Sequence, residues 1–161
     1  MIDRYVDINY SRVVSSAKTL PYETTLMVKD RCLCLHVQRA ARALARRFDE
    51  GLRPFELTNG QFSLLVSLNR PEPPLMGPVA SLLAMDRTTL TAALKPLERR
   101  GLVKIAKDKS DLRSRILILT EKGRVLLARA LPVWQRTHEE IENAASAVDL
   151  GSLRKSLRAI S

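Results

Sequence analysis

The segment VKIAKDKSDLRSRILILT, from Val103 to Thr120, gives the strongest indication of fold in this chain. Two arms rich in β-branched and apolar residues flank a loop of charged and small residues, a pattern typical of a two-stranded hairpin. The loop and its edges carry four cations, Lys107, Lys109, Arg113 and Arg115. We therefore predict a basic hairpin, or wing, over this segment.

A helix-turn-helix pattern precedes the hairpin. Pro78 suits the first turn of a short helix. Asp86 can cap a second helix over residues 87–100, and Gly101 can supply its left-handed C-terminal cap. Pro96 should bend this second helix without breaking it, because the leucines keep one face apolar. A short helix, a brief turn and a longer helix followed by a basic hairpin are a common way of gripping DNA.

Longer amphipathic helices are predicted on both sides of this module. Residues 30–52 place apolar side chains three and four positions apart, and a similar stripe follows Thr120 as far as about residue 147. Thr58 and Gln61 have the form of a capping box that starts another helix. Asp149 can cap a final helix that carries a leucine stripe.

The flanking helices offer more apolar surface than the middle module could cover. A second copy of the chain in a two-fold dimer is the economical partner, and a monomer whose long helices pack on each other is the alternative. The predicted fold class is mostly α (α+β), a winged helix-turn-helix domain with long N- and C-terminal dimerisation helices. We expect one domain over residues 1–161, divided into an arm and dimerisation helix (1–53), the winged helix-turn-helix (54–119) and C-terminal dimerisation helices (120–161). Residues 1–22 show no clear period and are expected to form a loose arm.

Composition and charge favour a polyanionic partner. The 161 residues are 45% hydrophobic, which is enough for one core without metal or disulfide support. The net charge is +10, and residues 75–119 contain nine Lys/Arg against four Asp/Glu, so half of the excess lies in the helix pair and hairpin. A merely solvated charged face is the alternative. No signal peptide or apolar run of about 18 residues is recognisable, so we expect a cytoplasmic protein without membrane contact.

Short motifs between residues 30 and 145 follow one another in a distinctive order. They are Leu57-Thr58 with Gln61-Phe62, Asp86-Arg87-Thr88-Thr89, the string LERRGLV from Leu97 to Val103, Asp111-x-Arg113-Ser114, and the string LTEKG from Leu119 to Gly123. In this order the motifs resemble the MarR family of bacterial winged-helix transcriptional regulators. The resemblance implies a homodimer formed by the terminal helices, with two recognition helices in successive major grooves of double-stranded DNA and each wing in a flanking minor groove.

The predicted recognition helix carries four candidate DNA-binding residues. Arg87, Thr88 and Thr91 lie opposite the leucines, near the end of the helix that meets base edges. Arginine can pair with guanine through two hydrogen bonds, and threonine can offer a hydroxyl or a methyl group. Lys95 lies farther along the same side and is expected to meet a phosphate.

The wing carries two more candidate residues. The resemblance implies that Arg113 is the minor-groove arginine and that Asp111 is the acid that holds it in place; a narrow minor groove rewards a cation there. An exposed Asp111–Arg113 ion pair that only ties the loop is the alternative. Leu112 stands where the commoner wing has an additional arginine, so one phosphate contact in each wing is expected to be missing.

Cys34 is a candidate redox sensor, because it falls where the organic-peroxide-sensing branch of the family places its reactive cysteine. Gln38 and Phe48 stand where that branch has tyrosines, and Arg31 with the nearby helix N-terminus could activate the thiol instead. A buried structural cysteine is the alternative. A small-molecule effector, bound between the dimer helices and the DNA-binding module, is the other way in which the family is controlled.

These observations predict a homodimeric, sequence-specific DNA-binding transcriptional regulator, a repressor that is relieved by a small ligand or an oxidant. A non-regulatory winged-helix module that binds a protein is the alternative. The sequence shows no paired carboxylates, nucleophile–base set or glycine-rich phosphate loop at recognisable spacing, so no enzyme is expected. Cys32, Cys34 and His36 would not converge on one ion in a helix, so neither a metal nor a cofactor is expected.

Overall fold

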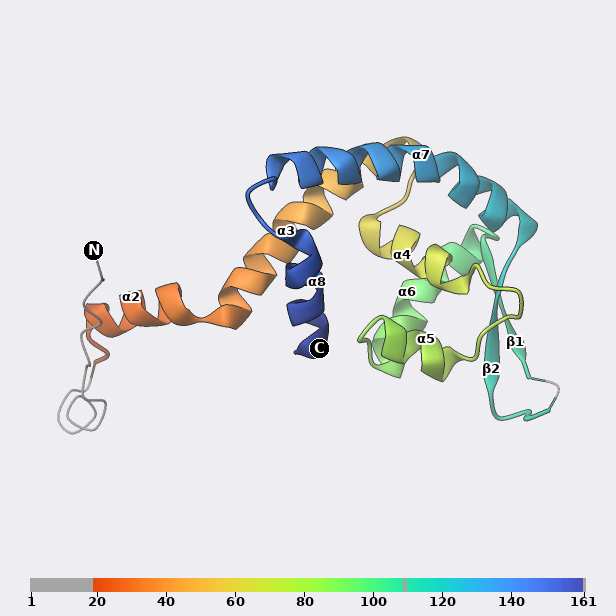
Figure 1. Cartoon of the computed structure of the whole chain (residues 1–161). Helices are drawn as coiled ribbons and strands as arrows, with labels where there is room; N and C mark the ends of the chain where they lie inside the picture. The colour runs from red at the N-terminus through yellow and green to blue at the C-terminus, as the bar shows by residue number, and fades with distance from the viewer. Residues whose placement is uncertain (1–18, 109, 161) are drawn as a thin grey trace. The chain divides into compact units, whose positions relative to one another are not determined.

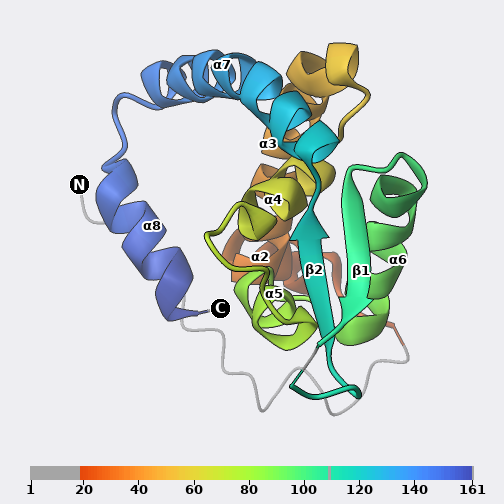
Figure 2. The same cartoon turned by 90° about the vertical axis from the view of Figure 1, so that its right-hand side faces the viewer.

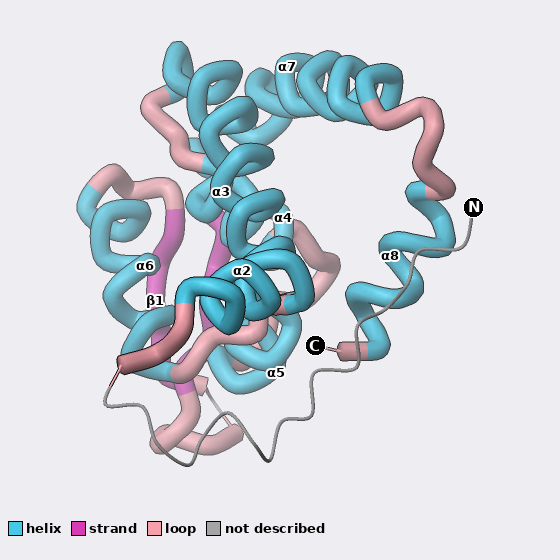
Figure 3. Tube along the Cα trace, turned by 90° about the vertical axis from the view of Figure 1, so that its left-hand side faces the viewer, coloured by secondary structure: helices cyan, strands magenta, loops and turns pink. Residues whose placement is uncertain are grey.

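The computed structural model describes residues 19–108 and 110–160. This part of the chain is mostly helical and contains one two-stranded antiparallel hairpin, drawn in magenta in Figure 3. The predicted fold class, a mostly helical winged helix-turn-helix protein, is therefore confirmed. Contacts between residues divide the chain into two compact units, residues 1–41 and 42–161.

The described part of the first unit contains a helix boundary that the sequence did not predict. Helix α2 (Tyr22–Arg31) and helix α3 (Leu33–Leu52) are separated at Cys32, whose backbone is extended. The prediction of one helix starting at residue 30 was wrong. The amide of Cys32 closes α2 by donating to the carbonyl of Val28 (2.9 Å), and its sulfur accepts from the amide of Leu35 (3.4 Å) as a cap for α3. Most of the arm predicted over residues 1–22 lies outside the described residues.

The second unit begins within α3 and contains all later elements (Figure 1). In chain order these are the 3-10 helix η1 (Arg53–Phe55), α4 (Asn59–Leu68), α5 (Met76–Leu82), α6 (Arg87–Arg99), β1 (Val103–Lys107), β2 (Arg115–Leu119), α7 (Glu121–Ala144) and α8 (Leu150–Ala159). Strand β1 lies against α6, and β2 lies against α4 and α5 (Figure 2).

A leucine-rich core joins α4, α5, α6 and the hairpin. Leu65, Leu90, Leu94, Leu97 and Leu117 are fully buried in it. Full burial of one leucine side chain contributes about 1.5–3 kcal/mol to folding. This core therefore packs the helix pair and the hairpin against each other.

Local caps set the ends of these helices much as the sequence predicts. Thr58 and Gln61 form the capping box of α4, since each side chain bonds to the other residue's amide. Gly101 has φ +69 and follows α6 as the left-handed residue. The amide of Leu102 then donates to the carbonyl of Leu97 (3.0 Å), which completes a Schellman motif. Helix α6 runs through Pro96 without a break, and its bend stays a prediction.

A third segment, just before α5, pairs briefly with the edge of the hairpin. The hairpin's own register runs from Val103 opposite Leu119 to Lys107 opposite Arg115. In addition, Leu75 forms a β-bridge with Ile116, and the amide of Leu117 donates to the carbonyl of Pro74 (2.9 Å). The start of α5 is thereby fixed beside the first residues of β2.

Helix α7 joins the winged module to the C-terminal helix. It is 24 residues long, passes through Pro132 and packs its Trp134 against the rings of Phe48 and Phe62, with both centroid separations 6.0 Å. His138 is half-buried and stacks on Trp134 at 4.9 Å. No helix in the described residues combines the length and apolar character needed to cross a bilayer.

Candidate nucleic-acid interface

The first turn of α6 is fixed by its N-cap. The carboxylate of Asp86 accepts from the amide of Thr89 (2.7 Å) and from its hydroxyl (2.8 Å). These hydrogen bonds, the backbone one first, lower the pKa of Asp86 below its ordinary value of 3.8. The ionised cap therefore holds the residues that follow it in a defined geometry at neutral pH.

The structure brings the four helix candidates together on one exposed face of α6. Leu90, Leu94 and Leu97 are buried, while Arg87, Thr88, Thr91 and Lys95 are exposed. The hydroxyl of Thr91 donates to the carbonyl of Arg87 (2.7 Å), so its oxygen as an acceptor and its methyl group remain for a partner. This face can present a cation, a hydroxyl and a methyl group to one surface.

Asp111 organises the tip of the wing through the backbone. Its carboxylate accepts from the amide of Arg113 (2.9 Å) and from the hydroxyl of Ser114 (2.7 Å). The Ser114 hydroxyl first, and then the Arg113 amide, lower the pKa of Asp111 below its ordinary value. Among the described residues, the Arg113 guanidinium has no ion-pair partner. The acid thus orders the backbone that carries the arginine and leaves the guanidinium free for another anion.

The start of β2, next to the wing loop, adds a cation that the sequence did not place in the site. Arg115 and Arg87 line one pocket of about 210 Å³, together with Leu75, Gly77 and Ser114. Arg115 was visible as one of the basic residues of the hairpin. Its position near Arg87 depends on the β-bridge between Leu75 and Ile116, which no local sequence pattern predicts.

The junction between α6 and α7 holds the hairpin in place. The hydroxyl of Thr120 donates to the carbonyls of Gly101 (2.7 Å) and Leu102 (3.0 Å), and it also accepts from the amide of Gly123 (3.1 Å). Lys122 donates from Nζ to the carbonyl of Arg100 (2.8 Å). These contacts give the side chains of Thr120 and Lys122 a structural role at the start of α7.

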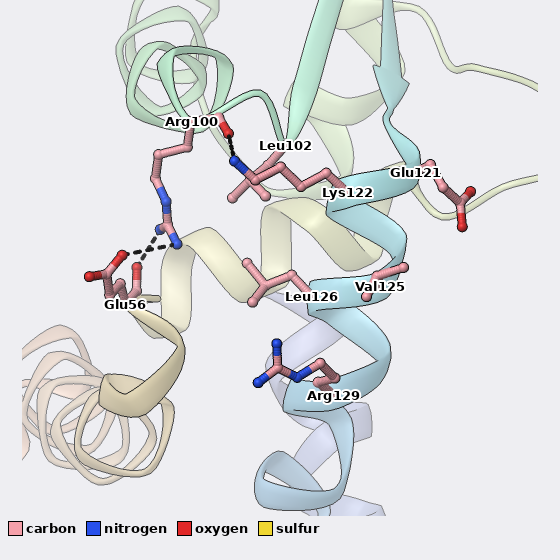
Figure 4. Close-up of a pocket in the computed structure, with 8 residues that line it drawn as sticks. All are labelled: Glu56, Arg100, Leu102, Glu121, Lys122, Val125, Leu126 and Arg129. Atoms are coloured by element: carbon pink, nitrogen blue, oxygen red, sulfur yellow. Dashed lines mark hydrogen bonds and ion pairs between the residues drawn. The ribbon is translucent and has the colours of Figure 1, made fainter.

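A second pocket of about 560 Å³ lies beside this junction (Figure 4). Leu102, Val125 and Leu126 give it an apolar wall. On its rim, Arg100 donates to the backbone carbonyl of Glu56 and lies 3.6 Å from that residue's carboxylate. The pocket therefore has an apolar wall and a rim whose charges are partly paired.

Cys34, the candidate redox sensor, is exposed in the first turn of α3. The side-chain amide of Gln38 donates to its sulfur at 3.2 Å. In the single chain its sulfur is therefore accessible, and its role as a redox sensor stays a prediction. Across residues 19–108 and 110–160, no three His, Cys, Asp or Glu side chains are grouped as metal ligands would be.

Comparison with known proteins identifies the family. A model of the MarR family matches residues 57–114. The transcriptional regulator TtmR of Methylorubrum extorquens (strain PA1) is 36% identical over 135 residues, which cover 81% of this chain and 69% of that relative. Its likeness to this chain therefore extends well beyond the segment that the family model matches.

Two solved structures are similar in both sequence and fold. The transcriptional repressor CouR, bound to a 23-mer DNA duplex, is 32% identical with a TM-score of 0.71, over 80% of this chain and 91% of CouR. The regulator MosR of M. tuberculosis, in complex with DNA, is 33% identical with a TM-score of 0.68, over 81% of this chain and 98% of MosR. With these likenesses and the matching motifs, the chain belongs to the MarR family of transcriptional regulators.

Proposed function

We propose that the chain is a homodimeric, sequence-specific DNA-binding regulator of transcription that acts as a repressor. The observation that carries this proposal is the pair of exposed basic elements, the α6 face and the wing, held by one core. Thr88 and Thr91 would face base edges in the major groove. Arg87, from the same turn of α6, would also contact the DNA. Lys95 would bind a phosphate, and Arg113, on a loop ordered by Asp111, would enter the minor groove. Its place of action would be the cytoplasm.

The test is a titration of the purified protein onto the DNA upstream of its own gene, with random duplex of equal length in parallel. Specific binding should survive at a salt concentration that removes the protein from random duplex. Arg113→Ala should weaken binding and reduce the slope of log affinity against log salt by about 1. Equal affinity for both duplexes would contradict sequence-specific regulation at that site.

The homodimer is supported by an apolar stripe on α8. Leu153, Leu157 and Ile160 are 43%, 38% and 62% exposed, although they share one side of the helix. A soluble domain rarely leaves such a stripe uncovered, and a symmetric partner would cover it with its own copy. Two recognition helices would then meet two half-sites of one duplex.

The second candidate function is binding of a protein instead of DNA. Removing positive charge from the α6 face distinguishes the two functions. If the basic face only aids solubility, then neutralising Arg87 and Lys95 leaves the activity intact. In the DNA-binding proposal the same double variant loses affinity and salt dependence together. Both residues are exposed, so the variants are expected to fold.

Relief of repression by an oxidant or a small ligand is the remaining part of the proposal. An exposed thiol supports the oxidant route, because a peroxide in solution can reach its sulfur. DNA affinity measured before and after mild peroxide is the test, with Cys34→Ser and Cys32→Ser as paired variants. Oxidant sensing is supported if peroxide abolishes DNA binding by the wild type and by Cys32→Ser but not by Cys34→Ser. An unchanged affinity in the wild type contradicts it and leaves a small ligand as the inducer.

A further inference from the structure

We propose that the pocket between Arg87 and Arg115 holds one phosphate of the DNA backbone. Arg115 becomes an additional DNA-binding residue, and Arg87 binds a phosphate and not a guanine edge. This inference rests on the proposed DNA binding and refines it, because it reassigns one residue and adds another.

Three separate elements build the pocket. Gly77 comes from the first turn of α5, Arg87 from the first turn of α6, and Ser114 and Arg115 from the wing, where its loop meets the start of β2. The bridge between Leu75 and Ile116 fixes α5 and the wing relative to each other. At about 210 Å³ the pocket is several times the ~30 Å³ that a water molecule occupies in the liquid, so it has room for a phosphate group.

The charged residues that line the pocket are all positive. Two guanidinium groups line it, and no acidic residue does. Among the described residues, neither Arg87 nor Arg115 forms an ion pair with an acid. Two cations that share a small space repel each other, and an anion between them removes this cost.

Both arginines are positioned for an anion. Arg115 donates from one nitrogen to the carbonyls of Leu112 (3.2 Å) and Ser114 (3.4 Å), which fixes its guanidinium and leaves other N–H groups for a ligand. Arg87 turns toward α5, because its Nη2 lies 4.0 Å from the point that a Cβ of Gly77 would occupy. An arginine that contacts a base would instead extend outward from the N-terminus of α6, away from α5.

The shape of DNA identifies the anion as a backbone phosphate. In the proposed complex α6 lies in the major groove and the wing in the adjacent minor groove. A sugar–phosphate strand separates these two grooves. Side chains that lie between α6 and the wing must therefore face that strand, and bidentate arginine is well suited to phosphate.

The experiment uses upstream duplexes in which one phosphate at a time is replaced by a neutral methylphosphonate. Affinity is measured for the full-length wild type, Arg115→Gln, Arg87→Gln and the charge-matched control Arg129→Gln, which lies on α7. We expect Arg115→Gln and Arg87→Gln each to weaken binding about tenfold or more, while the control changes little. One methylphosphonate should weaken wild-type binding yet have little further effect on either variant, because the contact is already lost.

Two results would overturn the inference. The first is Arg115→Gln behaving like Arg129→Gln. The second is Arg87→Gln losing its preference at one base pair while it keeps the wild-type response to every methylphosphonate, since that identifies a base reader. Equal binding of wild type to upstream and random duplex is a separate outcome that contradicts the proposed function itself. Thermal unfolding of each variant confirms that the exposed substitutions leave the fold intact.

Discussion

Gly123 has the least room for a side chain of the six glycines. A Cβ at this position would lie 2.3 Å from the carbonyl oxygen of Leu102 and 2.7 Å from a methyl carbon of Leu119. The start of α7 approaches Leu102 this closely because the amide (3.1 Å) and the hydroxyl (3.0 Å) of Thr120 both donate to the carbonyl of Leu102. Glycine is therefore required by contact and not by an unusual φ.

Gly123→Ala is expected to destabilise the protein by about 1–3 kcal/mol, because the first turn of α7 must move away from Leu102. Chemical denaturation measures this change in the free energy of unfolding. Gly60→Ala is the control, since a Cβ there would meet only the Thr58 hydroxyl at 4.0 Å. A Gly123→Ala protein as stable as the Gly60→Ala protein would show that the junction is looser than described.

Asp111→Ala is expected to weaken DNA binding without changing the melting temperature. The substitution removes the acceptors for the Arg113 amide and the Ser114 hydroxyl, both on an exposed loop outside the core. If the ordered loop becomes a minor conformation, then the apparent affinity falls in proportion, by about threefold to tenfold. Unchanged affinity in a DNA titration would mean that the loop needs no ordering by this acid.

The attachment of α8 to α7 depends on a few polar contacts. Arg154 of α8 bonds to Glu142 of α7, and Nε2 of His138 lies 3.1 Å from the same carboxylate. Helix α8 has ten residues and none of them is buried. Isolated helices shorter than about 12–15 residues are marginal in water, so this contact is expected to matter for the order of α8 in one copy of the chain.

Because of the contact between Arg154 and Glu142, the order of α8 should depend on pH. The hydrogen bond from Arg154 is the first cause that lowers the pKa of Glu142 below 4.5, and the charge of His138 adds to it. A carboxyl whose pKa is lowered by folding stabilises the fold above its ordinary pKa and ceases to do so as the pH falls through the lowered value. We therefore expect amide protection in residues 150–159 to hold at neutral pH and to fall in acid, starting near 4.5.

Glu142→Gln should lower protection of these amides at neutral pH and remove its acid dependence. Glu139→Gln is the matched control, because Glu139 is an exposed acid on the same helix. Amide exchange, corrected for the intrinsic pH dependence of the exchange rate, measures both effects. An identical acid profile in the two variants would exclude Glu142 as the titrating group.

The elements that the sequence predicts well are those with local chemical causes. The capping box at Thr58, the N-cap at Asp86 and the left-handed Gly101 each depend on a few neighbouring residues, and all three were confirmed. The break at Cys32 was missed because neither glycine nor proline marks it. The pairing of Leu75 with Ile116 was missed because it joins residues 41 positions apart. The pocket at Arg115 follows from that pairing, so a local pattern could not have found it.

Linking two winged helix-turn-helix modules in one dimer should increase DNA affinity far beyond that of either module alone. Once one recognition helix has bound its half-site, the second meets its own half-site at a high effective concentration. The apolar stripe of α8 is a candidate for the contact that links the two copies, because its leucines are exposed in a single chain. Affinity for a two-site duplex should therefore depend on residues remote from the DNA.

The double substitution Leu153→Glu and Leu157→Glu is expected to convert a dimer into a monomer, because it places two carboxylates in an apolar contact. Analytical ultracentrifugation measures the mass in solution, and the same samples should bind a duplex with two half-sites at least tenfold more weakly. Lys155→Gln is the control: it removes one positive charge on the side of α8 opposite the stripe. If the double variant stays a dimer with wild-type affinity, then α8 does not link the copies and other surfaces, among them those of α3 and α7, must do so.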